Sequence, residues 1–277
     1  STIEQARKLD AATIRDKYEE YTKIFPAMFT VLDHKFCVGD PMVLFMEGKH
    51  VNVPVMSGNT SDEFPSYIEA SSKEDLKKKA EEIFGKNAET FLRFPEAMQE
   101  DSDGKYAKVN GIECTIKCLF SEKKSAGEKK PYYYYRFDPD IPGWDNAGTF
   151  HSVDLWFFFE TLAKCWRPFV GQHYDLSRMM CNYWVNFIKT GDPNGNDADG
   201  KPMPYWYPYE KEKPCEMIFM SDRPVVNCGG ETPFKEFLQE QIKKTLSIGK
   251  IFHKEWLEPI WEGGYCFRET FAAVADE

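Results

Sequence analysis

The sequence predicts an α/β fold that is rich in helices and poor in strands. Two short runs, 51–56 and 131–137, have the Val-rich or Tyr-rich composition of buried strands. The stretch 176–188 repeats apolar residues at helical spacing, which is typical of a helix packed on a core. The chain has 277 residues, of which 42% are hydrophobic, enough for one large domain or two small ones. No internal repeat or linker divides it.

Capping residues and breakers give the order of the remaining elements. Asp10, Ser72 and Asp175 are of the type that begins a helix, and Gly85 is of the type that ends one. We expect the first strand to end at the turn-forming run 57–60. We predict helices over 10–23, 72–85, 156–166, 176–188 and 234–246, and a further short strand over 217–220.

Charge and hydropathy exclude two classes of partner. The formal net charge is −10, and no stripe of basic residues interrupts it, so we expect no nucleic acid as a partner. No apolar run approaches the roughly 20 residues of a membrane-spanning helix, so we expect no membrane partner.

The eight cysteines do not have the density of a disulfide scaffold. Cys114 and Cys118 form the only closely spaced pair, and no second Cys/His pair accompanies them at the spacing of a zinc site. Cysteine usage therefore favours a reducing compartment, with the cytoplasm as the expected location. The sequence opens at Ser1 without a Met, so it says little about targeting signals.

Two titratable residues follow the two predicted strands. Glu63 comes just after the first strand, and His151 comes after the second strand and a loop rich in Pro, Gly and Asp. The carboxyl ends of parallel strands are where α/β enzymes build their sites. A carboxylate bonded to a His ring fixes its tautomer, and α/β-hydrolases carry Ser, acid and His in that order along the chain. The alternative is that Glu63 is a turn carboxylate and His151 a residue at a helix start.

Three stretches carry a family resemblance. They are 53–63 (VPVMSGNTSDE), 148–155 (GTFHSVDL) and 184–194 (WVNFIKTGDPN) followed by WYP at 206–208. Together they resemble the C-terminal half of the type-B carboxylesterase family, which includes para-nitrobenzyl esterases and cholinesterases. The resemblance extends from about Ser1 to Met220, and Phe64 departs from the small residue often found after the family's acid.

The resemblance implies both a fold and a reaction. The fold is the C-terminal part of an α/β-hydrolase, helix-rich with the last few strands of the central sheet, and residues 1–277 are that portion of one esterase domain. The reaction is hydrolysis of a small-molecule carboxylic ester by acyl transfer, without a metal or an organic cofactor. Glu63 would be the triad acid and His151 the general base, and Asp154 would either support them or cap the following helix.

The nucleophile motif is missing from the sequence. No Gly-x-Ser-x-Gly occurs in the 277 residues. We therefore expect this chain alone to be inactive, and to pair with the N-terminal half of the same enzyme or with itself through an open sheet edge. Two other readings stay open, a non-catalytic esterase-like binding or adhesion protein and an unrelated helical α/β protein.

Overall fold

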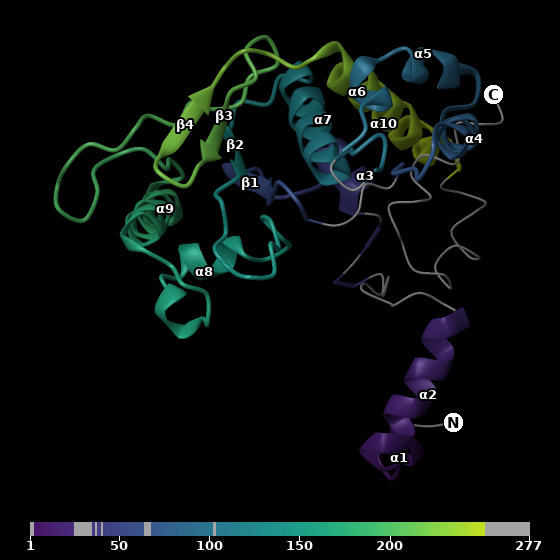
Figure 1. Ribbon diagram of the computed structural model, residues 1–277, viewed down its shortest axis with the longest axis horizontal. Helices are drawn as coiled ribbons and strands as arrows, with labels where there is room; N and C mark the ends of the chain where they lie inside the picture. Colours follow the sequence, from purple (N-terminus) through teal and green to yellow (C-terminus); the bar gives the residue numbers. More distant parts are fainter. Residues whose placement is uncertain are drawn as a thin grey trace.

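A four-stranded sheet lies at the centre of the protein, and helices cover both of its faces (Figure 1). The computed structural model describes residues 3–24, 35–36, 38–39, 41–63, 68–101 and 104–252. The strands lie in the order β1 (Val55–Thr60), β2 (Tyr132–Phe137), β3 (Glu216–Phe219) and β4 (Pro224–Asn227). The first three are parallel, and β4 returns antiparallel to β3. The predicted α/β class is confirmed.

Helices account for most of the remaining regular structure. They are α1 (Ile3–Ala6), α2 (Ala11–Ile24), α3 (Pro41–Met46), α4 (Lys73–Phe84), α5 (Ala88–Leu92), α6 (Pro95–Met98), α7 (Gly111–Ser125), α8 (Asp154–Phe158), α9 (Gly171–Thr190) and α10 (Pro233–Phe252), with single 3₁₀ turns at Gly85–Asn87 and Leu162–Lys164. The caps predicted at Asp10, Ser72 and Gly85 are confirmed, whereas Asp175 lies inside α9, whose N-cap is Val170. The Asp75 amide donates to Ser72 Oγ at 3.0 Å, and the Thr13 amide donates to Asp10 Oδ1 at 2.9 Å.

The tyrosine-rich strand β2 explains why both faces of the sheet are covered. Side chains alternate across a strand. Tyr133 and Tyr135 pack with residues of α8 and α9 on one face, whereas Tyr132 and Tyr134 pack with Phe120 of α7 on the other. Figure 1 shows α8 and α9 on one side of the strands and α7 on the other. A strand buried on both faces needs the near-continuous apolar run that the sequence has here.

The predicted bounds of the first strand are wrong. The strand begins at Val55 and continues through the turn-forming run to Thr60. Each of its residues pairs with β2, from Val55 opposite Tyr132 to Thr60 opposite Phe137. This ladder outweighs the local turn preference of Ser, Gly and Asn, because strand propensity depends strongly on pairing and context. As a result Glu63 follows the true end of the strand by three residues.

Two predicted helices also differ from the structure. The helix expected from Asp175 begins four residues earlier, at Gly171. The helix expected over 156–166 ends at Phe158, because Glu160 takes a left-handed backbone with a φ of 49° that an α-helix cannot continue through. The strand expected near 217–220 and the helix expected over 234–246 are present as β3 and within α10. His34, Phe64 and His253 lie outside the described residues.

The described cysteines comprise one disulfide, two buried thiols and two half-buried thiols, Cys165 and Cys181. Cys215 and Cys228 form a disulfide that closes the β3–β4 hairpin, with Cα atoms 4.2 Å apart. This bond runs against the expected reducing compartment, because disulfides persist mainly in oxidising surroundings. Cys114 and Cys118 are buried thiols, and burial raises the pKa of each to about 12. They lack the thiolate character that a reactive or metal-binding cysteine needs.

The described residues contain neither a cluster of metal ligands nor a helix that could span a membrane. No group of three or more His, Cys, Asp or Glu side chains there is arranged to hold a metal ion. Among the described helices, none combines the length and the apolar composition that a bilayer crossing requires.

A buried ion cluster joins α7, β3 and the start of α10. Lys117 Nζ lies 2.9 Å from a carboxylate oxygen of Glu113, 2.9 Å from one of Glu216 and 3.0 Å from one of Glu231. Lys235 pairs with the same oxygen of Glu113. The Lys117 side chain is 3% exposed. We call these five residues the ion cluster. Its hydrogen bonds compensate for part of the cost of burying charge.

Candidate active site

The two residues singled out in the sequence meet in the structure. His151 Nδ1 lies 2.8 Å from Glu63 Oε2, although 88 positions separate the residues. Their strands β1 and β2 are parallel neighbours, so both residues follow the carboxyl edge of the sheet. The Glu63 side chain is 7% exposed and the His151 side chain 57% exposed. A buried carboxylate thus holds an imidazole ring that is open to solvent.

The Glu63 carboxylate is oriented by its own turn. Its second oxygen, Oε1, accepts a hydrogen bond from the Thr60 amide at 3.2 Å. The turn is itself held to α7, because the Asn110 side-chain amide donates to the Thr60 carbonyl at 3.2 Å. Asn110 is also the N-cap of α7, so one side chain fixes both the helix start and the turn. With both oxygens engaged, the carboxylate has a defined direction.

Asp62, the neighbour of the acid, ties the two segments of the site together. Its Oδ2 accepts hydrogen bonds from the amide and from the hydroxyl of Thr149, each at 3.0 Å. Its Oδ1 accepts one from Lys108 at 2.7 Å. Burial opposes ionisation of Asp62, but these donors outweigh it and lower the pKa of the carboxyl below its usual value. The contact requires Gly148, which has a φ of 62° and where a Cβ would meet Asp62 Oδ2 at 2.7 Å.

Asp154 is the first residue of α8 and follows His151 by three positions. Val153 is the N-cap of α8, and the cap position makes no side-chain hydrogen bond, so the capping role weighed for Asp154 is not the one observed. Its Oδ2 instead accepts a hydrogen bond from the Tyr135 hydroxyl at 3.1 Å, and the residue is buried. Burial is the main cause that raises the pKa of Asp154 above its usual value, and the nearby Glu63 carboxylate adds to it.

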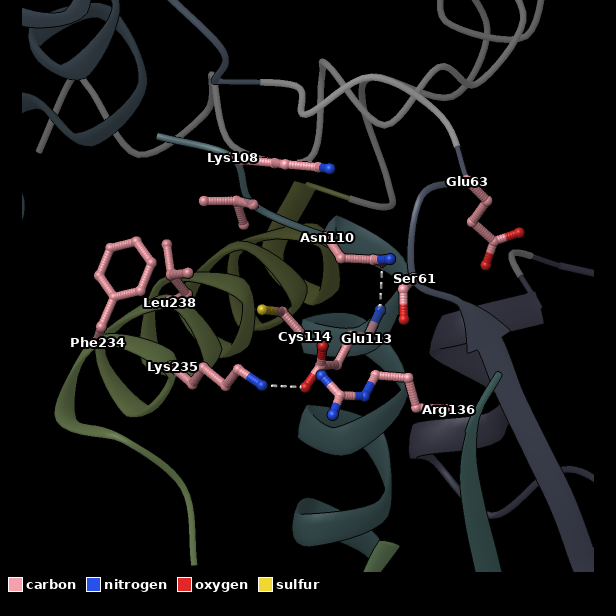
Figure 2. Close-up of a pocket in the computed structure, with 11 residues that line it drawn as sticks. Ser61, Glu63, Lys108, Asn110, Glu113, Cys114, Arg136, Phe234, Lys235 and Leu238 are labelled. Carbon is pink, nitrogen blue, oxygen red and sulfur yellow. Dashed lines mark hydrogen bonds and ion pairs between the residues drawn. The ribbon is translucent and has the colours of Figure 1, made fainter. Parts of the chain in front are cut away.

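A cavity of about 230 Å³ opens on the other side of the acid (Figure 2). Glu63 and Ser61 line one end, and Arg136, Glu113 and Lys235 line the other. Figure 2 shows the Arg136 guanidinium directed toward the Glu113 carboxylate that Lys235 also contacts. The lining therefore carries charged side chains of both signs.

The other described histidines have structural partners. The His50 ring lies 4.5 Å from the Phe45 ring, centroid to centroid, and so packs on that ring. His173 is buried in the first turn of α9, where its Nδ1 accepts a hydrogen bond from the Val170 amide at 3.0 Å. Neither ring contacts a carboxylate in the way that His151 does.

Sequence reasoning missed the residues that hold the pair in place. Thr149 immediately precedes the histidine segment, but only the fold shows that it bonds to Asp62. The sequence places Tyr135 in a buried strand. Its hydroxyl contact with Asp154 depends on the position of α8, which the sequence does not show. The signal available in the sequence was the proximity of Asp62 and Thr149 to the two proposed residues.

Comparison with known proteins gives one family. The model of the carboxylesterase family matches residues 112–232. Carboxylesterase 4A of Bos taurus is 27% identical over 224 residues, which cover 70% of this chain and 39% of that protein. Cocaine esterase of Homo sapiens is 23% identical over 217 residues, covering 69% of this chain and 38% of that protein. Bile salt-activated lipase of Rattus norvegicus is 32% identical over 103 residues, 35% of this chain and 16% of that protein.

Solved structures agree on the fold. A PNB esterase matches with a TM-score of 0.59 at 22% identity, over 84% of this chain and 49% of that one. The carboxylesterase of Geobacillus stearothermophilus matches with a TM-score of 0.51 at 18% identity, over 85% and 49%. The sheet and its helices are therefore part of an α/β-hydrolase fold. The chain spans about two-fifths of the length of the first two curated relatives, 39% and 38%.

Proposed function

We propose that this chain, whose residues 112–232 match the model of the carboxylesterase family, supplies the acid and the base of a serine ester hydrolase. The observation that carries the proposal is the 2.8 Å contact between Glu63 and His151 Nδ1 at the carboxyl edge of the sheet. The names of the relatives support the choice of substrate class, because two of them are called esterases. The substrate is then a small-molecule carboxylic ester.

The proposed chemistry is acyl transfer. A Ser hydroxyl attacks the ester carbonyl carbon while His151 Nε2 takes its proton, and the imidazolium then gives that proton to the leaving alcohol. Water repeats the cycle on the acyl-enzyme: His151 takes a proton from water, the hydroxide adds to the acyl carbon, and the carboxylic acid leaves as Ser regains its proton. Glu63 holds the His151 proton on Nδ1 and stabilises the imidazolium. Every step uses side chains and water.

The nucleophile is proposed to lie on a segment outside these 277 residues, which contain no Gly-x-Ser-x-Gly. Residues 1–277 would then be the C-terminal portion of one esterase domain. The outer edge of β1 has no neighbouring strand among the residues that the structure describes, and an open edge presents unpaired backbone groups. We propose that a strand of the nucleophile-bearing segment pairs with β1 there, and that the isolated chain self-associates instead.

The test is ester hydrolysis by the complete protein, with the coding sequence extended upstream of Ser1. We expect turnover of para-nitrophenyl butyrate, and loss of about 10⁴-fold or more in kcat when His151 is replaced in His151→Gln. His50→Gln is the matched control, since His50 packs on Phe45 and should leave kcat unchanged. The 277-residue chain alone should not hydrolyse the ester.

Two results would count against the proposal. If His151→Gln keeps the wild-type kcat in the complete protein, His151 is not the base. The second result is an upstream sequence that carries another residue in place of the Ser of Gly-x-Ser-x-Gly. If the complete protein then has no esterase activity, the chain is better explained as part of a non-catalytic esterase-like binding or adhesion protein.

A further inference from the structure

The loop between β2 and His151 contains no helix or strand that would fix its conformation. It leaves β2 after Phe137. Gly143, Gly148 and Pro142 interrupt it, and Trp144 within it is 88% exposed. A base must be held close to the geometry that proton transfer requires, so contacts from outside the loop have to orient it.

Arg167 supplies contacts of this kind from the segment before α9. Its side chain is 5% exposed. Two of its nitrogens donate to the Asp145 carboxylate, Nη1 to Oδ1 at 2.9 Å and Nη2 to Oδ2 at 2.7 Å, and Nη1 also donates to the Pro142 carbonyl at 3.1 Å. This paired geometry is the strongest form of an Arg–carboxylate contact. Arg167 thus holds the part of the loop that contains Pro142 and Asp145.

The same guanidinium reaches the end of the loop. It lies 5.1 Å from the centroid of the Phe150 ring and 4.7 Å from that of Trp166, within the range of cation–π contacts. Phe150 is the residue directly before His151. The packing tolerates no side chain at Gly143, where a Cβ would meet Arg167 Nη1 at 2.4 Å.

The segment that carries Arg167 is itself held by the core on the α8 and α9 side of the sheet. The Phe169 ring lies 5.6 Å from the Phe157 ring of α8 and 5.3 Å from the His173 ring of α9. Arg167 therefore connects a rigid part of the fold to both ends of the loop. Asp62 holds the same loop from the β1 side through Thr149, independently of Arg167.

We propose that Arg167 is a positioning residue, which orients His151 toward Glu63 by clamping loop 142–150 at Pro142, Asp145 and Phe150. Lysine cannot replace it, because an ammonium group has neither the paired donors nor the flat face that the site uses. The effect of this clamp on catalysis rests on the proposed function, whereas its effect on the ring does not.

The experiment is nitrogen-15 NMR of the His151 ring in the 277-residue chain, with Arg167→Met, Arg167→Lys and Asp145→Asn. In the native chain we expect the neutral ring to carry its proton on Nδ1, bonded to Glu63. Each variant should move the ring toward a mixture of tautomers, with the Nδ1-protonated share reduced by at least twofold. The matched control is Arg223→Met, because Arg223 faces Asp222 on the surface at 3.9 Å with 75% of its side chain exposed.

The same variants in the complete protein test the catalytic consequence. We expect kcat for para-nitrophenyl butyrate to fall by about 10- to 100-fold with KM changed by less than about twofold, as for a misplacement of about 1 Å. If Arg167→Met does not fold, Asp145→Asn decides, because the Asp145 side chain is 29% exposed and its loss leaves Arg167 in place. A folded variant with unchanged His151 signals overturns the inference. Shifted His151 signals without any esterase activity in the wild-type protein would keep the clamp and refute only the proposed function.

Discussion

Two regions of the molecule hold a carboxylate against a basic side chain at nearly the same distance. His151 lies 2.8 Å from Glu63, and Lys117 lies 2.9 Å from Glu113 in the ion cluster. Their surroundings differ. The His151 side chain is 57% exposed and Lys117 is 3% exposed. Lys117 contacts three carboxylates, and the pKa of Glu113 is far from its usual value, lowered to about 2.

This difference distinguishes a structural ion pair from the catalytic pair that we propose. A proton must leave and return during catalysis, so the base needs access to the reacting group and a partner that does not fix its charge. The ion cluster differs on both points, because the Lys117 side chain is only 3% exposed and the charges of Lys117 and Lys235 keep Glu113 ionised. The lowered pKa of Glu113 belongs to the ion cluster and not to the Glu63–His151 pair, so a shifted pKa alone does not identify the candidate site.

The comparison is sharpened most by removing the acid. In the complete protein, Glu63→Gln should lower kcat for para-nitrophenyl butyrate by about 10⁴-fold, since an amide cannot stabilise the imidazolium and favours the wrong tautomer. Urea unfolding of this variant should differ little from wild type. Glu89→Gln is the control, because that side chain is 87% exposed beside Arg93. An unchanged kcat would place Glu63 outside the catalytic pair.

Removing the cation of the cluster should have the opposite outcome. Lys117→Met leaves Glu113, Glu216 and Glu231 buried with Lys235 as the remaining cluster cation, and should cost about 3–5 kcal/mol of unfolding free energy. Urea unfolding measures the loss. Lys77→Met is the control for an exposed pair, expected within about 0.5 kcal/mol. If the two variants lose equal stability, the cluster is not a structural element.

The acid limb of stability should also come from the cluster. Burial opposes ionisation of Glu113, but the charges of Lys117 and Lys235 outweigh it and lower its pKa from 4.5 to about 2. Because the folded pKa lies below the unfolded one, this stabilisation is present above pH 4.5 and is lost as the pH falls toward 2. We expect Glu113 to account for about 3 kcal/mol of the change, measured by urea unfolding at pH 5 and pH 2. Glu113→Gln should flatten that dependence; an unchanged slope would contradict it.

The smallest effect on stability is expected for a substitution of Asp154. Burial and the Glu63 charge raise the pKa of Asp154, so its ionised form is disfavoured in the folded state. Asp154→Asn should therefore stabilise the fold at pH 7 by about 1 kcal/mol or less, while the Tyr135 hydroxyl donates to the amide oxygen instead. Thermal unfolding at pH 7 and at pH 5 tests this, with a smaller gain at pH 5. A loss of stability at pH 7 would mean that the charge itself is needed.

The sequence by itself singled out Glu63 and His151, the two residues that the structure places in contact. Each of the two residues follows an apolar run and a polar segment, and each lies in a sequence motif that resembles one family. Local chemistry also determined the helix starts at Asp10 and Ser72, because a cap requires only residues three positions apart. The alternating burial of the tyrosine run follows from the two-residue period of a strand.

Only the tertiary structure decided the features that depend on residues far apart in sequence. Pairing with β2 set the bounds of β1 against its own turn preference. Arg167 meets Asp145, and Lys117 meets Glu216, only once the sheet and helices have packed. The spacing of residues along the sequence does not predict such contacts, because ion pairs and disulfides depend on which side chains the chain topology brings within a few ångströms. The sequence therefore named the two residues of the site, and packing decided how each is held.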